Sequence, residues 1–591
     1  MQQNPLFRDA DISFLLREVF HVASLCELER FSHHDLETFE LYIESARALA
    51  RTRLFPLFKE MDANEPTFDG VHVRVHPRMG ALYDALAELG VVSAPRPGSV
   101  GGADLPQTVV TVANLHLMAA NAGAVGFPLL TAGAAHLIEA FGDDDLKATY
   151  MQPMYDGRWT GTMALTEPHA GSSLAEITTT ATPNSDGTFR VRGAKIFISG
   201  GDHDIRENIV HMTLARIAGA PEGIKGVSLF AIPKYRVSPD GLVHNDVHTT
   251  QLIHKIGWKA LPSVALGFGE NDDCHGWLVG APGHGLKYMF QMMNEARLMV
   301  GANGIATASA AYFEALAYAD TRRQGRGLAA ASTPGAVRLI EHPDVRRMLL
   351  RQKAIVEGGL ALLIQTGLFA DTAAGATGAT QIRAAAILDL LTPIAKSFPA
   401  EWGFESNSLA LQILGGYGYT SEYLPEAWLR DQRLNSIHEG TTGIQGLDLL
   451  GRKVVAHNGA ALAGLIEELQ ATTDAAARID ALAPLATKLS SLSALAQETT
   501  HTLARRGLGG DIVGMLGHSD DYLRAMSVMT VAWMWLKIAV AAHARPASDF
   551  SRGKIAACRY WFAAEVPRAT AWFGNATRDD DAFVDLDERC F

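Results

Sequence analysis

The chain has 591 residues, of which 48% are apolar and 19% are charged, a composition typical of globular proteins with large cores. Its length predicts roughly two to four domains. The formal net charge of -13 disfavours a nucleic-acid-binding surface, because such a chain repels polyanions. The cysteines show no CxxC pair, which argues against a disulfide framework or a cysteine metal site and favours a reducing compartment, the cytoplasm. They are Cys26, Cys274, Cys558 and Cys590.

The chain begins with helical patterns. Residues 1–35 form a predicted N-terminal helical extension, with apolar side chains at helical spacing between Ile12 and Val19. They lack the basic and apolar segments of a secretory leader. Residues 36–157 are predicted to form an N-terminal α-domain, because they hold long runs rich in Ala and Leu, with a Pro/Gly break at 95–102.

From residue 158 to residue 278 the apolar period shifts toward two, which predicts a central β-domain. Strand-like alternation begins at Phe189, Lys195 and Val227, and turn signals at 184–187 and 239–241 separate the strands. Helical periodicity returns in two further regions. Residues 279–455 are predicted to form a four-helix bundle, and 456–591 a C-terminal helical extension interrupted at 507–510.

One apolar run, Met526–Ala542, approaches the length of a membrane span. It is about 17 residues long and contains Lys537, so we predict a buried helix and no membrane span. Such a run needs a covering surface, since an exposed apolar patch of this size promotes aggregation. The expected partners are the long apolar helices of the bundle or those of its symmetry mate.

The most informative segment, residues 412–445, reads QILGGYGYTSEYLPEAWLRDQRLNSIHEGTTGIQ. A Gly-rich break at 414–418 lies about two dozen residues before an isolated carboxylate, Glu439, which is followed directly by Gly440 and Thr441. Helices rarely tolerate so many glycines. Both places are therefore predicted to bring the backbone close to a ligand.

A second pair of motifs lies upstream, at 163–172 (MALTEPHAGS) and 195–201 (KIFISGG). Together with the 412–445 segment, these motifs resemble the acyl-CoA dehydrogenase family over roughly residues 40–455. Family members carry ILGG-x-G and EGT motifs, the latter with the catalytic Glu, and upstream TEP-x-AGS and K-x-W-I motifs. Phe197 stands where the family usually has Trp, which keeps an apolar stacking surface and loses an indole N–H donor.

The resemblance implies an acyl-CoA dehydrogenase-like fold with an N-terminal α-helical domain, a central β-domain and a C-terminal four-helix bundle. Here an extra C-terminal helical domain follows. It also implies FAD as cofactor, an acyl-CoA substrate, an electron-transfer flavoprotein as electron acceptor, and an assembly of at least two chains.

The implied reaction is the α,β-dehydrogenation of a fatty acyl-CoA to the trans-2-enoyl-CoA, the first step of β-oxidation. Glu439 is the implied base for the α-proton, while the β-hydrogen passes as hydride to flavin N5. The backbone N–H of Glu439 and a flavin ribityl hydroxyl are the implied donors to the enolate oxygen. Substrate binding is expected to exclude water and so to raise the pKa of Glu439 toward neutrality.

Matching family positions supply the other site residues. The implied substrate contacts are Ser172, Asn294 and Arg297. The implied FAD contacts are Met163, Leu165, Thr166, Phe197, Ser199, Arg322, Gln412, Gly415, Gly416, Gly440 and Thr441, of which Arg322 and residues 412–416 match positions that reach the flavin of a neighbouring subunit. No metal ligand is implied.

Two of these positions have alternative interpretations. Arg297 is equally suited to capping a helix or covering surface with its stem. His438, where Tyr is more common, is interpreted as a packing residue rather than a second base.

The sequence does not identify the acyl group of the substrate. The long connection from Arg322 to Arg346 resembles the longer branch of the family, which includes 3-methylmercaptopropionyl-CoA dehydrogenases and bacterial fatty acyl-CoA dehydrogenases. A methylmercaptopropionyl group is therefore the alternative to a fatty acyl chain. The small residues of 119–126 predict either a deep acyl channel or tight helix packing.

Two other classes of function compete with a dehydrogenase. An acyl-CoA oxidase would use the same base and pass its electrons to O2, but the 163–172 and 412–445 motifs read more like dehydrogenases. A non-catalytic DNA-associated flavoprotein would extend this fold with a basic C-terminal region. Residues 456–591 hold 13 Lys and Arg against 16 Asp and Glu, which disfavours that class.

Overall fold

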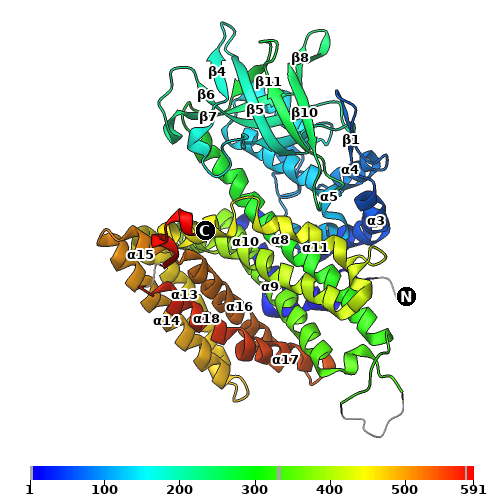
Figure 1. The fold of residues 1–591 in the computed structure, drawn as a ribbon, viewed down its shortest axis with the longest axis vertical. Coiled ribbons are helices and arrows are strands. Elements are labelled where there is room, and N and C mark those ends of the chain that lie inside the picture. The colour runs from blue at the N-terminus through cyan, green and yellow to red at the C-terminus, as the bar shows by residue number, and fades with distance from the viewer. Residues whose placement is uncertain (1–3, 329–334, 580–581) are drawn as a thin grey trace. The chain divides into compact units, whose positions relative to one another are not determined.

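The computed structural model describes residues 4–328, 335–579 and 582–591 (Figure 1). It divides into two compact units. We call Leu41–Leu105 with His116–Ala296 the sheet unit. Met1–Glu40, Pro106–Leu115 and Arg297–Phe591 together are the helical unit.

The sheet unit contains all the strands of the described residues. They are β1 (Thr67–Phe68), β2 (Val73–Arg74), β3 (Thr160–Ala164), β4 (Thr180–Pro183), β5 (Phe189–Ser199), β6 (Ile209–Ile217), β7 (Val227–Pro233), β8 (Tyr235–Ser238), β9 (Gly241–His244), β10 (Val247–Ile253), β11 (Ser263–Phe268) and β12 (His275–Leu278). An eight-stranded sheet has the order β10-β11-β5-β12-β7-β6-β3, with β4 paired to β5 and β6. Both β3 and β4 run parallel to β6, and the other neighbours are antiparallel.

The predicted turns separate strands as expected, at 184–187 between β4 and β5 and at 239–241 between β8 and β9. In the first turn, Asp186 accepts hydrogen bonds from the backbone N–H and the hydroxyl of Thr188. Strand β7 is buried along its whole length rather than on alternate residues, so the alternation predicted from Val227 does not hold there, although the strand itself is present.

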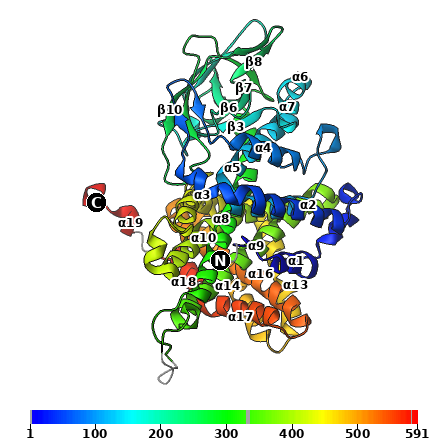
Figure 2. The same cartoon turned by 90° about the vertical axis from the view of Figure 1, so that its right-hand side faces the viewer.

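The helices of the first half of the chain include one that lies along the sheet. They are α1 (Asp9–Phe14), α2 (Leu36–Leu49), α3 (Phe55–Ala63), α4 (Met79–Glu88), α5 (Gln107–Phe141), α6 (Asp144–Leu146) and α7 (Gln152–Tyr155). Figure 2 shows α5 beside β3 and β6, where Leu137 and Ile138 share a core with Val210 and Met212. A Cβ on Gly161 of β3 would come within 2.5 Å of Ala134 Cβ, so glycine permits this approach.

The small residues of α5 serve tight packing, one of the two predicted alternatives. A Cβ on Gly123 would lie 2.8 Å from Ala260 Cβ, and one on Gly126 would lie 2.8 Å from Leu261 Cδ2. These distances are below van der Waals contact, so the turn at Ala260 and Leu261 occupies the space that the small residues leave.

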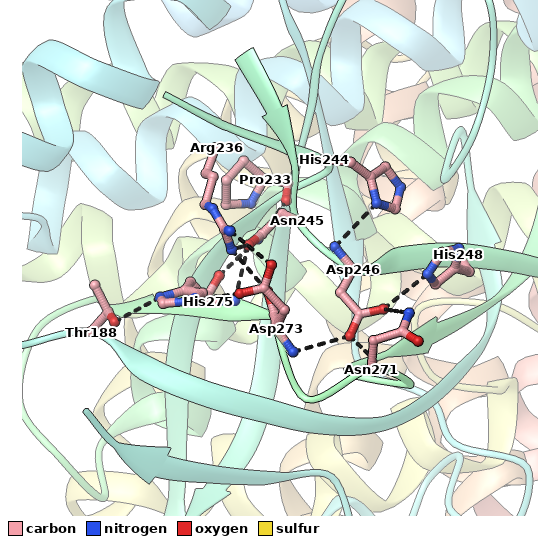
Figure 3. A network of polar contacts seen from close by, with 10 residues as sticks. All are labelled: Thr188, Pro233, Arg236, His244, Asn245, Asp246, His248, Asn271, Asp273 and His275. Atoms are coloured by element: carbon pink, nitrogen blue, oxygen red, sulfur yellow. Dashed lines mark hydrogen bonds and ion pairs between the residues drawn. The ribbon is translucent and has the colours of Figure 1, made fainter. Parts of the chain in front are cut away.

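A polar network ties the end of β9 to the loop before β12 (Figure 3). The buried Asp246 accepts hydrogen bonds from the backbone N–H groups of Asn271 and Asp273 and contacts His248. The neighbouring Asn245 donates to the carbonyls of Pro233 and His275. Because these buried polar groups have partners, the network fixes loop geometry in the sheet unit. In the described part of the chain, no group of three or more His, Cys, Asp or Glu is placed to hold a metal ion.

The second half of the chain is helical. Its helices are α8 (Gly285–Thr321), α9 (Pro343–Gly375), α10 (Gly378–Leu414), α11 (Pro425–Arg433), α12 (Thr442–Asp448), α13 (Ala460–Ala477), α14 (Ala483–Leu508), α15 (Ile512–Leu516), α16 (Ser519–Ala544), α17 (Asp549–Ala564), α18 (Val566–Ala576) and α19 (Ala582–Asp585). The break predicted at 507–510 follows α14. The long connection predicted after Arg322 includes residues 329–334, which lie outside the described residues.

Helix α10 continues through Pro393 and Pro399. A proline inside a helix lacks an N–H and leaves the carbonyl four residues earlier without its helical donor. Lys453 Nζ donates to one such carbonyl, that of Asp389, at 2.8 Å. The second such carbonyl, that of Ala395, packs against Gly301 of α8. A Cβ on Gly301 would be only 2.0 Å from this oxygen, so glycine allows the two helix backbones to approach.

The apolar run 526–542 is a buried helical segment, as predicted. It belongs to α16, and in Figure 1 the orange and red helices of this region lie alongside α9 and α10. Trp533 and Trp535 are fully buried. Their indole N–H groups donate to Thr472 Oγ1 of α13 at 2.8 Å and to the Ala354 carbonyl of α9 at 3.0 Å. The C-terminal extension therefore packs on the bundle helices of the same unit.

By length and apolar composition alone, three helical stretches are able to cross a membrane. They are Gln107–Phe141, Pro343–Gly375 and Ile512–Ala544, and 56%, 89% and 83% of their most apolar windows are buried within the fold. Burial accounts for the apolar composition of the last two.

The N-terminal extension is held to the same helices by buried charges. Lys554 Nζ of α17 donates to Asp11 Oδ1 of α1 at 2.7 Å and to Glu357 Oε2 of α9 at 2.9 Å. Although burial opposes ionisation, the charges of Lys353 and Lys554 hold the pKa of Glu357 at about 2. Both terminal extensions thus join the bundle through one ion network.

Candidate active site

Glu439 lies in a strained turn between the 3-10 turn Leu434–Ser436 and helix α12. Its φ is +55° and that of Gly440 is +86°, so two successive residues adopt the left-handed conformation. For a residue with a side chain this conformation is costly and is often found at functional sites. A Cβ on Gly440 would lie 2.6 Å from Gln445 Nε2, so both the angle and the space require glycine.

Polar contacts made by three side chains hold this turn. The buried Gln445 donates to the Glu439 carbonyl at 3.0 Å, and Lys396 Nζ of α10 donates to the Gly440 carbonyl at 2.8 Å. Thr442 donates its hydroxyl hydrogen bond to Glu401. Neither Lys396 nor Gln445 is marked by a motif in the sequence. The only sequence signal is that Lys396 is a charge within an apolar helical stretch, and its contact is made by tertiary packing.

The Glu439 carboxyl has the properties of a base. Burial raises its pKa to about 7, against the opposing charges of Arg297 and Lys396. Among the described residues, no group forms a hydrogen bond or ion pair with this carboxylate, and none accepts a hydrogen bond from the Glu439 backbone N–H. One residue therefore presents a base with a pKa near neutrality and an available backbone donor.

Arg297 is 3% exposed, so its stem does not cover surface. Its guanidinium donates to Asp448 Oδ2 of α12 at 3.1 Å, and its charge acts on Glu439. Burial lowers the pKa of the neighbouring His438 to about 3, which makes it too weak a base at neutral pH and fits its interpretation as a packing residue.

In the sheet unit, the predicted flavin residues lie on β3, β5 and the loop after β3. Met163 is in β3, Leu165 and Thr166 follow it, and Phe197 and Ser199 end β5. The Ile196 N–H donates to the Thr166 carbonyl at 2.9 Å, which joins the loop to β5.

A buried ion pair supports this arrangement. Lys195 Nζ of β5 donates to Glu167 Oε1 at 2.8 Å and to the Leu165 carbonyl at 3.0 Å. Burial opposes the charge of Glu167, but Lys195 and the donors Thr178 and Thr179 hold its pKa at about 2. The family motifs contain both charges, but only the fold reveals that they pair.

Phe197 fits a planar apolar ligand. Its side chain is 62% exposed and its φ is +61°, an uncommon conformation for a bulky residue. The partly exposed Thr166 and Ser199 lie on the same two segments and offer hydroxyl and backbone groups. An exposed aromatic ring flanked by such groups suits the apolar face and polar edge of a flavin. Ser172 is exposed in the following loop, and Asn294 is partly buried in α8.

The remaining predicted residues lie in the helical unit. Arg322 is exposed directly after α8, and Gln412 is exposed near the end of α10. A Cβ on Gly415 or Gly416 would meet no atom within 4 Å, in contrast to Gly440. Rings of Tyr318 in α8 and Tyr417 lie 6.5 Å apart, which brings the end of α8 close to the Gly-rich turn.

The structure thus brings Glu439, Gly440 and Thr441 together with Arg297. It also brings the end of α8, which Arg322 follows, close to the Gly-rich turn. The sheet unit holds Met163, Leu165, Thr166, Phe197 and Ser199 on joined segments. The assignment of Ser172 and Asn294 to the substrate stays a prediction.

Four family models match the chain in order. The N-terminal, middle and C-terminal domain models of acyl-CoA dehydrogenase match residues 37–158, 162–269 and 283–454, and the model "Acetyl-CoA dehydrogenase C-terminal like" matches 465–587. These matches confirm the predicted fold class, including the extra C-terminal domain.

Two relatives are similar over almost the whole chain. The 3-methylmercaptopropionyl-CoA dehydrogenase of Ruegeria pomeroyi is 36% identical, covering 92% of this chain and 93% of its own length. A broad-specificity linear acyl-CoA dehydrogenase of Mycobacterium tuberculosis is 32% identical, covering 98% of each. The solved structure of a Bacillus anthracis acyl-CoA dehydrogenase complexed with FAD shares the fold, with a TM-score of 0.75 at 20% identity, over 93% of this chain and 90% of that one. The chain therefore belongs to the acyl-CoA dehydrogenase family, a family of oxidoreductases.

Proposed function

We propose that this protein is an FAD-dependent acyl-CoA dehydrogenase that introduces the α,β double bond into a fatty acyl-CoA, with Glu439 as the base. The observation that carries the proposal is the state of Glu439. Loss of solvation raises the pKa of its carboxyl to about 7, and no described residue forms a hydrogen bond with either the carboxylate or the backbone N–H of Glu439. The α-proton of a thioester needs both a base and a donor to the enolate oxygen.

Glu439 and Arg297 have different roles in the proposed reaction. Glu439 takes the α-proton, and its backbone N–H donates to the thioester oxygen as negative charge develops there. The left-handed turn at Glu439 and Gly440 directs both groups from one residue. Arg297 adds positive charge beside the base and keeps part of the carboxyl population ionised at neutral pH.

FAD fits the exposed Phe197 ring and the adjoining Thr166 and Ser199, which would hold the flavin ring. When bound, FAD supplies the acceptor for the β-hydrogen as hydride. The ion pair between Glu167 and Lys195 joins the loop after β3 to β5, the two segments that would contact the flavin. The FAD named in the B. anthracis structure and the family match support this assignment.

A survey of thioesters tests the proposed function. Purified holoprotein is assayed from butyryl- to stearoyl-CoA, with 3-methylmercaptopropionyl-CoA included, using an artificial electron acceptor and peroxide detection. We expect enoyl-CoA formation without stoichiometric peroxide, and efficient reduction of an electron-transfer flavoprotein. A burst of peroxide with each acyl-CoA would instead identify an oxidase, and preference for the methylmercapto substrate would select that alternative acyl group.

The pH dependence of kcat/KM is expected to show an acidic limb with an apparent pKa near 7. Glu439 must be ionised to act as a base, and burial raises its pKa to about 7. Activity should therefore fall about tenfold per pH unit below this value. Steady-state kinetics across pH would check it, and a limb near the ordinary Glu value of 4.5 would contradict the buried base.

We expect the functional assembly to contain at least two chains with one FAD each. Gln412 and the Gly-rich turn are exposed, and Tyr419 beside them is 93% exposed, an unusual aromatic exposure for a surface without a partner. Light scattering of the holoprotein should give at least twice the 63.5 kDa of one chain. A monomer that retains FAD would contradict the cross-subunit roles of Arg322 and Gln412.

We further propose that the protein acts in the cytoplasm. All four cysteines are free, and Cys274 and Cys558 are buried, which supports a reducing compartment. Fractionation of the native host cells, with a cytoplasmic marker enzyme as reference, tests this location.

A further inference from the structure

We infer that Lys396 is a positioning residue for the proposed reaction: its buried ammonium fixes the Gly440 carbonyl and thereby the left-handed turn that presents Glu439. The inference rests on the proposed function. Lys396 acts on Glu439 indirectly, through the backbone next to the base and through its charge, and does not contact the reacting atoms.

The geometry is specific to the turn. Lys396 lies in α10, is 0% exposed, and donates from Nζ to the carbonyl oxygen of Gly440 at 2.8 Å. Gln445 fixes the adjoining Glu439 carbonyl from α12 at 3.0 Å. Gln445 also donates to the Gly440 carbonyl, at the longer distance of 3.3 Å, so the two carbonyls of the strained turn are held from two different helices, with the shorter contact to Gly440 made by Lys396. Such bracing is needed to maintain a left-handed conformation at a residue with a side chain.

Other buried lysines show what a purely structural arrangement looks like here. Lys195, Lys453 and Lys554 each have a carboxylate oxygen within 2.9 Å. In the described part of the chain, no carboxylate lies within ion-pair distance of Lys396 Nζ. Burying an ammonium without a close counter-ion is costly. Its position is therefore better explained by the turn that it holds than by a stabilising ion pair.

The charge of Lys396 also acts on the base. Burial lowers the pKa of Lys396 to about 8, Glu401 and Glu439 raise it, and Arg297 lowers it. Lys396 is therefore largely protonated at neutral pH. Its charge lowers the pKa of Glu439 against the effect of burial, as does that of Arg297, and it also lowers the pKa of His438. Lys396 thus has two separable effects, a hydrogen bond that orients the turn and a charge that tunes the base.

A series of substitutions separates these effects. K396M removes both, K396Q removes the charge and keeps an N–H donor, and K396R keeps the charge. The matched control is K537M, because Lys537 is partly buried, has its pKa lowered by burial to about 8, and donates to a neutral acceptor, Gln365 Oε1, at 2.7 Å. K537M reports what the loss of any such lysine does to the fold.

The first readout is kinetics across pH on FAD-loaded protein. We expect K396M to lower kcat about 10- to 100-fold, as a slightly misplaced catalytic group does, with less than about a threefold change in KM. The acidic limb should move upward by about one pH unit in K396M and K396Q and stay in place in K396R. K537M should keep the wild-type limb and KM.

The second readout needs no turnover. The pKa of Glu439 is higher in the folded state, at about 7, than its ordinary value of 4.5. Protonation of Glu439 therefore stabilises the fold fully at pH values below about 4.5, and this stabilisation is lost as the pH rises through about 7. The amide of E439Q does not ionise, so this variant does not lose stability in the same way. Between pH 4.5 and about 7, the unfolding temperature of the wild type should therefore fall relative to that of E439Q. In a K396M background the same difference should continue to grow to higher pH.

The outcomes distinguish the two proposals. K396M with wild-type kcat and an unmoved limb would overturn the positioning role, and equal limb shifts in K396R and K396M would overturn the charge effect. If K396M does not fold while K537M does, K396Q and K396R carry the same tests. A wild-type protein that oxidises no acyl-CoA refutes the proposed function, whereas the unfolding measurements still test the link between Lys396 and Glu439.

Discussion

Replacing Glu439 with Gln is expected to leave FAD and acyl-CoA bound while lowering kcat by about 10²–10⁴-fold, the usual effect of losing a general base. The amide keeps the shape of the side chain and cannot accept the α-proton at neutral pH. The turn is held through backbone carbonyls by Lys396 and Gln445, so the substitution should not disturb it. Steady-state kinetics, flavin absorbance and calorimetric titration with acyl-CoA measure the three properties.

The control for E439Q is D371N. Asp371 is a carboxylate that is 2% exposed and, like that of Glu439, its pKa is raised by burial, here to about 6, but it accepts hydrogen bonds from the Thr108 hydroxyl and from the backbone at the start of α5. D371N should lower stability and leave kcat close to that of the wild type. Glu439 is not the base if E439Q keeps more than about a tenth of the wild-type kcat, well above what general-base loss leaves.

Removal of residues 456–591 is expected to give insoluble or flavin-poor protein. The extension covers bundle helices, since Trp535 donates to the Ala354 carbonyl of α9 and a Cβ on Gly358 of α9 would lie 2.6 Å from its Nε1. It also reaches the helix that follows the catalytic turn. A Cβ on Gly446 of α12 would lie 2.8 Å from the Ser519 carbonyl at the start of α16. Truncation therefore exposes apolar surface and removes a support of α12.

A point variant measures the same interface without deleting it. W535A should destabilise the protein by about 3–5 kcal/mol, the range for a buried aromatic residue replaced by Ala. W535F, which keeps most of the apolar volume and loses the indole N–H, should cost clearly less. Chemical denaturation and the ratio of flavin to protein absorbance provide the measurements. A soluble, FAD-replete truncation with an unchanged assembly would show that residues 456–591 form an independent module.

Local sequence signals were sufficient to predict the order of the helical and strand regions, and they led to the prediction that Glu439 is the base. Apolar periodicity separated the strand region from the helical regions, and Gly/Asp turn signals marked the turns between β4 and β5 and between β8 and β9. Both patterns are local because side chains repeat every two residues in strands and every 3.6 in helices. The Glu439–Gly440 pair was predicted from a short motif, because its glycine and carboxylate are adjacent in the chain.

Only the tertiary structure decided what surrounds the base. Lys396 meets Gly440 because α10 packs beside the turn, and Glu167 meets Lys195 because β5 lies beside the loop after β3. The left-handed φ of Glu439 likewise depends on contacts with other helices. The sequence did not decide whether the small residues of α5 line an acyl channel or serve close packing, because a glycine does not specify which group lies next to it. The sequence was thus sufficient to identify the family and to predict Glu439 as its base, whereas the pKa of Glu439 depends on side chains from separate elements and was decided by packing.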